Sequence, residues 1–189
     1  DDIQAIADQL ISEWIDDGEV DLLNRLCVPL PIYVIADQLG VPRSELTLLK
    51  KWSDASTSRL GRLADEEQQI QNAKDIVEFQ HYFADLIDRM REHPEDNIIS
   101  DLANNTIDEG RLLTKPEALG MIQQILVAGN ETSTNAIAGG VVLLIENPEE
   151  QAKLRANPDL IPTAVEEILR LETPTSGMWR RATQDTEID

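Results

Sequence analysis

The sequence Val-Ala-Gly-Asn-Glu-Thr-Ser-Thr-Asn fills positions 127–135, in the middle of residues 115–146, the least polar stretch of the chain. Residues on both sides of it are mostly apolar or small, as at Ile122 and Ile145. This composition predicts one long helix, which at about 1.5 Å per residue would cross a domain of ordinary size. The polar residues leave no run of about 18 apolar positions, so a helix in a protein core is favoured over a membrane span.

The centre of this helix carries the polar segment 129–132, Gly-Asn-Glu-Thr. A glycine inside a helix costs about 1 kcal/mol against alanine, and a buried carboxylate costs more unless it is paired or solvated. Two such penalties at one place are typical of a functional site, although a segment that faces solvent would explain them equally well. The chemistry indicated is proton delivery. Thr132 would bond a carbonyl one turn back, and Glu131 would relay protons from solvent.

The rest of the chain predicts further helices joined by short breaks. Gly18 and Gly40 end two of them, Pro31 opens one, and the pair His93-Pro94 ends the longest polar one. After Pro174 the pattern becomes extended, at 181–183 and 186–188. The sequence thus predicts a mainly α fold with a short β region near residue 189, and a single domain over 1–189. The predicted helices are 1–17, 32–39, 44–59, 64–92, 98–103, 115–146, 148–156 and 161–171.

Charge and cysteine content restrict the possible partners and compartment. The chain has 36 acidic and 16 basic residues and a formal net charge of −20, which disfavours nucleic acid and anionic membranes as partners. Cys27 is the one cysteine of the chain and lies in an apolar run, so we expect a small buried hydrophobe. A single thiol forms no internal disulfide, which favours the reducing cytoplasm. His81 and His93 show no metal-ligand spacing with it.

Charged residues downstream of the long helix form a second pattern. Glu167 and Arg170 are three residues apart on a predicted helix, a spacing that usually gives an exposed ion pair. Apolar neighbours such as Ile168 and Leu169 surround them. Arg180 leads into the predicted β region, and its planar guanidinium suits a carboxylate partner.

Taken together, these residues resemble the cytochromes P450, the haem–thiolate monooxygenases, of the soluble bacterial type. The family's central helix carries Ala/Gly-Gly-x-Asp/Glu-Thr-Thr/Ser, which residues 128–133 match at every position. Its next landmark, Glu-x-x-Arg, is matched by Glu167 and Arg170. The stretch 174–183 fits the Pro and the Arg-x-Ala-Thr-like strand that follow. Residues 29–42 resemble the soluble bacterial members.

The resemblance implies a role for each of these residues. Glu131 and Thr132 would be catalytic, with Thr132 holding the hydrogen bonds at bound dioxygen and Glu131 supplying protons. Glu167 and Arg170 would form a structural ion pair in a buried network behind the haem. The residues that would bind the haem, iron protoporphyrin IX, are Ala128, Gly129 and Arg180, the last through a propionate. The residues that would line the substrate pocket are Val127, Thr175, Ser176, Gly177 and Met178.

The activity implied is insertion of one atom of dioxygen into a small organic substrate, with electrons from a ferredoxin and its NAD(P)H-dependent reductase. The family's haem-ligating cysteine lies downstream of the strand and has no match here, and Cys27 precedes the central helix. We therefore expect a central fragment of a P450 domain that is inactive alone. Two alternatives stay open: a catalytically silent helical binding protein on the same scaffold, and a family member that uses peroxide. The acid–alcohol pair disfavours the second.

Overall fold

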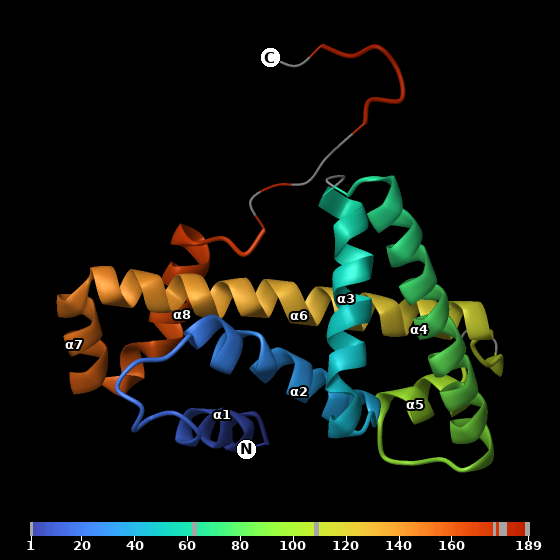
Figure 1. The fold of residues 1–189 in the computed structure, drawn as a ribbon, viewed down its shortest axis with the longest axis horizontal. Helices are drawn as coiled ribbons and strands as arrows, with labels where there is room; N and C mark the ends of the chain where they lie inside the picture. The colour runs from blue at the N-terminus through green and yellow to red at the C-terminus, as the bar shows by residue number, and fades with distance from the viewer. Residues whose placement is uncertain (1, 62–63, 108–109, 176, 178–180, 188–189) are drawn as a thin grey trace. The chain divides into compact units, whose positions relative to one another are not determined.

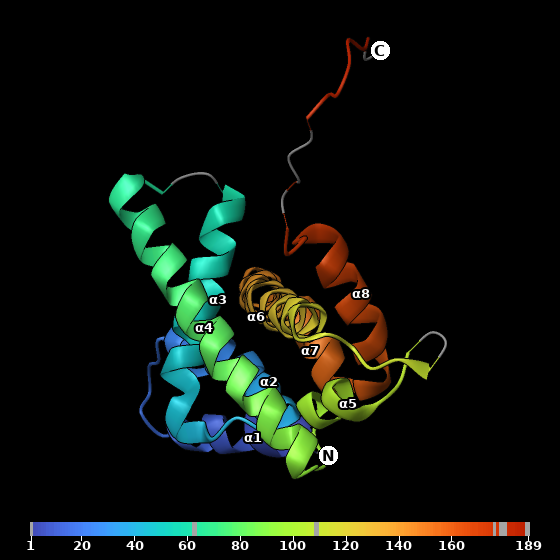
Figure 2. The same ribbon diagram turned by 90° about the vertical axis from the view of Figure 1, so that its right-hand side faces the viewer.

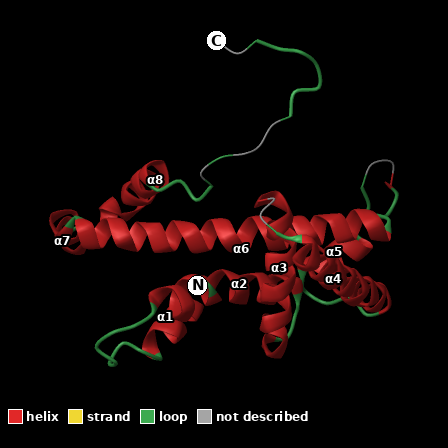
Figure 3. Ribbon diagram, turned by 45° about the horizontal axis from the view of Figure 1, so that its top comes forward, coloured by secondary structure: helices red, strands yellow, loops and turns green. Residues whose placement is uncertain are grey.

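The structure is a computed structural model that describes residues 2–61, 64–107, 110–175, 177 and 181–187. These residues are mainly helical (Figure 3). The short 3-10 turns η2 (Arg43–Glu45) and η4 (Pro158–Leu160) and the π-helical turn η1 (Leu23–Cys27) lie between longer helices in the described part of the chain. The α-helices, labelled in Figure 1, are α1 (Asp2–Ser12), α2 (Pro29–Leu39), α3 (Leu46–Gly61), α4 (Glu66–Glu92), α5 (Ile98–Asn104), α6 (Lys115–Glu146), α7 (Pro148–Ala156) and α8 (Ile161–Leu171).

The helix predictions are confirmed most closely in the second half of the chain. α6, α7 and α8 begin and end at the predicted residues. α1 is shorter than predicted, because hydrogen-bonded turns replace the helix after Ser12. Pro29, and not Pro31, opens α2; either proline is compatible with a first helical turn, where its missing N–H has no partner to lose.

The predicted β region is not confirmed in the residues that the structure describes. Residues 181–187 contain no strand, and the last predicted position, Ile188, lies outside the described range. An extended segment becomes a strand only when a neighbour pairs with its N–H and C=O groups. Within the described ranges such pairing is limited to one isolated antiparallel bridge, between Thr106 and Leu112.

A capping box fixes the start of α6. The Thr114 backbone N–H donates to the Glu117 carboxylate at 2.8 Å, and the Glu117 N–H donates back to the Thr114 hydroxyl at 3.4 Å. These bonds satisfy amide groups that a helix end leaves without partners. Arg111 holds the same carboxylate through two further hydrogen bonds of 2.9 and 2.8 Å.

The chain divides into two compact units, residues 1–134 and 135–189, and the boundary falls inside α6. The core of the first unit is built by α2 to α5 and the first part of α6. Its centre is aromatic: Trp52 of α3 lies within 5.9 Å, between ring centroids, of both Phe79 and Phe83 of α4. Figures 1 and 2 show these two helices side by side. The prediction of one domain over residues 1–189 stays a prediction.

The second unit contains the last part of α6 with α7, η4 and α8. α8 packs on α6 at Gly140, where an added Cβ would lie 3.0 Å from Cγ2 of Ile168. Apolar side chains of α8, including Ile161 and Val165, are exposed. Of all the helices that are described, α6 included, none combines the length and the apolar composition that a bilayer crossing requires.

Acid titration tests the capping box. Hydrogen bonds from Arg111, and then from Thr114, lower the pKa of the Glu117 carboxyl from 4.5 to about 2. A lowered pKa stabilises the folded protein above the unfolded value, and this contribution is lost as the pH falls from 4.5 towards 2. We expect Glu117→Gln to unfold at lower urea concentration than the parent at pH 7, with the difference disappearing over that acid range.

The matched control for this test is Glu66→Gln. Glu66 is an exposed glutamate in the first turn of α4, so the substitution removes a similar charge near a helix start without removing the box. A Glu117→Gln difference that stays constant down to the acid limit would contradict the assignment.

Candidate functional site

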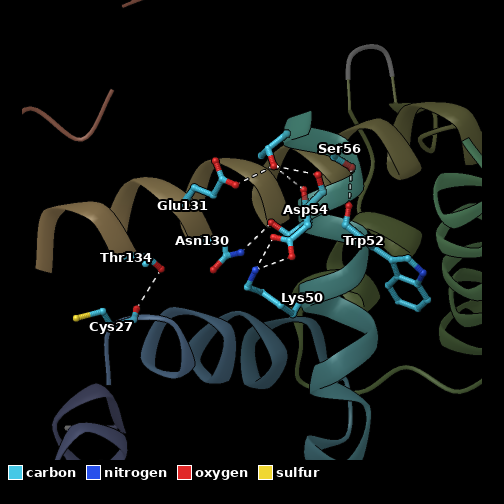
Figure 4. Close-up of polar contacts among 10 residues, drawn as sticks. Cys27, Lys50, Trp52, Asp54, Ser56, Asn130, Glu131 and Thr134 are labelled. Carbon is cyan, nitrogen blue, oxygen red and sulfur yellow. Dashed lines mark hydrogen bonds and ion pairs between the residues drawn. The ribbon is translucent and has the colours of Figure 1, made fainter. Parts of the chain in front are cut away.

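The polar segment of α6 divides into a buried side and an outward side. Asn130 and Thr134 are four residues apart, so they share one face of the helix, and they are only 1% and 8% exposed. Glu131 is exposed and Thr132 is half-buried. Figure 4 shows Glu131 pointing away from the side of α6 that carries Asn130 and Thr134. One stretch of sequence therefore supplies both anchors for the helix and an acid and an alcohol on its other side.

Thr132 makes the backbone bond that the sequence predicted. Its hydroxyl donates to the carbonyl oxygen of Ala128, one turn back, at 2.5 Å. Ala128 itself is exposed, so a small methyl group and a hydroxyl lie next to each other on the outer face of α6. A face built in this way leaves room for a flat apolar group to approach the helix backbone.

For Glu131 the structure supports the solvent-facing interpretation of the polar segment, and not the buried one. Its side chain is exposed, so solvent satisfies its charge and burial imposes no penalty on it. One of its carboxylate oxygens accepts a hydrogen bond of 2.8 Å from the hydroxyl of Thr57 in α3. Both residues, with Asp54 and Ser58, line a shallow hollow of about 310 Å³. The carboxylate is thus held in place while it stays open to proton exchange with solvent.

Asn130 is the polar residue of α6 that sequence reasoning left without a role. Its side-chain amide donates to the hydroxyl of Ser53 in α3 at 2.8 Å, and both residues are almost completely buried. The amide oxygen of Asn130 finds no donor among the residues that the structure describes. A buried acceptor without a partner costs about 1–3 kcal/mol. An apolar residue would avoid that cost, so packing alone does not explain this asparagine.

Ser53 belongs to a row of hydroxyls on α3 that faces α6. We call Ser53, Ser56 and Thr57 the α3 hydroxyl row; their spacing of three and four residues puts them on one helix face. Ser56 accepts a hydrogen bond of 3.1 Å from the amide of Gln123. The row thus joins α6 at three points, through Gln123, Asn130 and Glu131. The run Ser-Asp-Ala-Ser-Thr-Ser at 53–58 was the sequence signal for it.

Cys27 and Thr134 join α6 to the end of η1. The Thr134 hydroxyl donates to the carbonyl oxygen of Cys27 at 3.0 Å (Figure 4). The Cys27 side chain is fully buried, which confirms the prediction of a small buried hydrophobe. Burial raises the pKa of this thiol, so the thiolate needed for metal ligation is disfavoured here.

Gly129 has a packing reason of its own. A Cβ built on Gly129 would lie 3.2 Å from Cδ1 of Ile35 in α2, which is closer than ordinary van der Waals contact. The missing side chain therefore allows α6 to approach α2. The family resemblance implied that Gly129 borders the haem, which stays a prediction; the structure gives it in addition a packing neighbour inside the first unit.

The other predicted site residues lie in the first unit, in the second unit or outside the described residues. Val127 of α6 is half-buried. Thr175 and Gly177 follow α8 and are exposed. Ser176, Met178 and Arg180 lie outside the residues that the structure describes.

The ion pair of α8 forms as its spacing predicted. Arg170 donates two hydrogen bonds to Glu167, of 2.7 and 2.6 Å, and they lower the pKa of the Glu167 carboxyl. The side chains are 55% and 65% exposed for Glu167 and Arg170, so the burial implied by the family resemblance is not present. The physical reason is that no described residue packs over this face of α8.

Sequence comparison places these features in a known family. The family model described as Cytochrome P450 matches residues 63–189. The cytochrome P450 YjiB of Bacillus subtilis (strain 168) is 36% identical over 189 residues, which are 98% of this chain and 48% of that protein. The cytochrome P450 monooxygenase PikC of Streptomyces venezuelae is 36% identical over 190 residues, which are 99% of this chain and 44% of that protein.

Solved structures agree with the sequence relatives. The crystal structure of P450BioI in complex with hexadec-9Z-enoic acid ligated acyl carrier protein superposes with a TM-score of 0.84 at 33% identity, over 92% of this chain and 44% of that chain. Cytochrome P450 CYP109Q5 from Chondromyces apiculatus gives a TM-score of 0.83 at 32% identity, over 98% of this chain and 45% of that chain. The chain belongs to the cytochrome P450 family. It spans about half the length of the curated relatives it matches.

Haem is the cofactor of this family, and the outer face of α6 fits it. Ala128 offers a small exposed side chain against which a planar ring can lie, and the Thr132 hydroxyl is its neighbour. Within the described ranges, no group of three or more His, Cys, Asp or Glu side chains is placed to hold a metal ion. Cys27 is buried beneath the opposite, inner side of α6, so it does not fit the role of iron ligand.

Substitution of Gly129 tests its packing role. Alanine favours a helix over glycine by about 1 kcal/mol, but its methyl group would press on Ile35. We expect Gly129→Ala to stabilise the protein clearly more in an Ile35→Val background, which removes Cδ1, than in the parent, as measured by urea unfolding. An equal effect in both backgrounds would show that Ile35 does not set the size of residue 129.

Proposed function

We propose that this chain forms the central part of a haem-dependent monooxygenase that inserts one atom of dioxygen into a small organic substrate. Family membership supports this, and its relatives include proteins named vitamin D(3) 25-hydroxylase and steroid C26-monooxygenase. The observation that carries the proposal is the outer face of α6. There an exposed acid, Glu131, adjoins Thr132, whose hydroxyl is already held by hydrogen bonding.

Haem would supply the activation of dioxygen, with its iron held by a cysteine thiolate as in the family. Ala128 and, through its backbone, Gly129 would border the ring. Arg180 would pair with a propionate by a charge-assisted hydrogen bond. Glu167 and Arg170 would be structural, and their exposed faces would become covered in the intact protein.

Proton delivery would be the work of this chain's own side chains. The Thr132 hydroxyl donates to the Ala128 carbonyl at rest, so its oxygen lone pairs are free to accept a hydrogen bond. Rotation about its C–O bond would turn the proton towards a developing negative charge. Glu131, held by Thr57 and open to solvent, would take up protons from water and return them to this network.

We further propose that a ferredoxin and its NAD(P)H-dependent reductase supply the electrons, and that the protein works in the cytoplasm. The absence of a suitable membrane-crossing helix among the described residues is compatible with a redox partner that diffuses to the enzyme. The substrate would contact Val127 and the segment 175–178. Carboxylates dominate the charge of the chain, which favours neutral or cationic organic molecules over anions as substrates.

Spectroscopy of the intact enzyme tests the function. When the reduced protein binds carbon monoxide, we expect the red-shifted Soret band of thiolate-ligated haem. A band at the position typical of histidine ligation, or failure of the intact protein to bind haem, would overturn the proposal.

Substitution of Thr132 in the intact enzyme tests the proton-delivery role. We expect Thr132→Ala to reduce the product formed per reducing cofactor consumed by roughly tenfold or more, because a positioned proton donor typically contributes about 10²–10⁴-fold. Thr132→Ser keeps the hydroxyl and should retain most of the parent's coupling. Equal coupling in the alanine variant and the parent would contradict the role.

A further inference from the structure

We propose that Asn130 is a positioning residue. Through the α3 hydroxyl row it fixes the rotation of α6 about its own axis and thereby directs Glu131 and Thr132 outward. This inference rests on the proposed function, because it concerns the orientation of the same acid and alcohol. Asn130 is not itself a catalytic residue: it is 1% exposed and lies on the buried side of the helix.

The geometry of the three contacts supports this role. The bonds from Gln123 to Ser56, from Asn130 to Ser53 and from Thr57 to Glu131 measure 3.1, 2.8 and 2.8 Å. On α6 these contacts extend over about two helical turns. A helix rotates by about 100° for each residue, so a slip of one residue would break all three bonds together. A row of directional bonds defines both the rotation and the axial position of α6 relative to α3.

The apolar packing around these bonds does not define rotation in the same way. Ile122 and Leu126 of α6 are fully buried in the first unit, but burial of apolar surface is non-directional. Hydrogen bonds depend steeply on distance and angle. The buried apolar residues set which face of α6 turns inward, and the polar contacts narrow its rotation and axial position within that arrangement. Asn130–Ser53 is the contact among them that solvent cannot replace.

The orientation of the reactive pair depends on this selection. Thr132 bonds within its own helix, to Ala128, and so it turns wherever α6 turns. The one hydrogen bond that the described residues give the Glu131 side chain comes from the hydroxyl of Thr57, which is only half-buried. Asn130 is the direct neighbour of Glu131 in the chain and lies two residues before Thr132, nearly opposite it on the helix. A loss of the buried bond would therefore change where both groups point.

Four variants of the intact enzyme test the inference: Asn130→Ala, Ser53→Ala, the double alanine variant, and the exchange Ser53→Asn with Asn130→Ser. We expect each single substitution to lower product per reducing cofactor severalfold, while the amount of thiolate-type carbon monoxide band per protein stays at the parent's level. The double variant should lower product per reducing cofactor no further than the poorer single variant does, because each of the three variants removes the same Asn130–Ser53 hydrogen bond. The exchange should restore part of the coupling.

Hydrogen exchange supplies a readout that needs no turnover. Backbone amide hydrogens of residues 128–133 should exchange severalfold faster in each single variant than in the parent. The variant that combines Ser53→Asn with Asn130→Ser should slow this hydrogen exchange again. Thr47→Ala is the matched control, because it removes an exposed hydroxyl from α3 outside the α3 hydroxyl row. It should leave both coupling and amide exchange as in the parent.

Two results would overturn the inference. One is a haem-loaded Asn130→Ala or Ser53→Ala variant with the parent's coupling; the other is a loss of turnover number with coupling unchanged, which indicates a merely structural role. Ser53→Ala removes a single oxygen atom and guards against failure of the asparagine variant to fold. If the parent itself shows no thiolate-type band, the proposed function fails. The hydrogen-exchange rates of the backbone amides still decide whether Asn130 fixes the rotation of α6.

Discussion

The buried hydrogen bond between Asn130 and Ser53 is the contact on which the orientation of Glu131 and Thr132 depends most. It is the buried member of three hydrogen bonds between α3 and α6, and both of its partners are excluded from solvent. Its directional character narrows the rotation of the long helix further than non-directional apolar burial does. The half-buried hydroxyl of Thr132 and the exposed carboxylate of Glu131 then follow from the pitch of the helix.

The helices of this chain were largely readable from its sequence because their signals are local. Proline at the starts of α7 and α8, and asparagine before Pro148 and Pro158, define helix ends within a few residues. The nearly continuous apolar composition of residues 115–146 identified α6, and the pair His93-Pro94 defined the end of α4. The π-helical turn η1 was not predicted, since a run such as Leu-Asn-Arg-Leu-Cys has no local feature that distinguishes it from an ordinary turn.

Only part of the candidate site could be predicted from the sequence, because the other contacts join residues that are far apart in the chain. The Thr132–Ala128 bond is contained within one helix and could be anticipated. The exposure of Glu131 and the bond of Asn130 depend on α3, which lies more than seventy positions earlier in the sequence. The same reason applies to the exposed pair Glu167–Arg170 and to the unpaired residues 181–187: both predictions required neighbouring segments that local patterns do not specify.

The contact between Gly129 and Ile35 has a consequence for how sequences of this kind diverge. A methyl group at position 129 and the terminal methyl group of residue 35 compete for one small volume. An alanine at 129 requires the terminal methyl group of Ile35 to give way by a few tenths of an ångström, so mutation at one position alters the selection acting on the other. A lineage that shortens residue 35 becomes free to acquire alanine at 129, and reversion at 35 is then hindered. Two positions 94 residues apart in the chain, 129 minus 35, are thereby expected to change in pairs and in a preferred order.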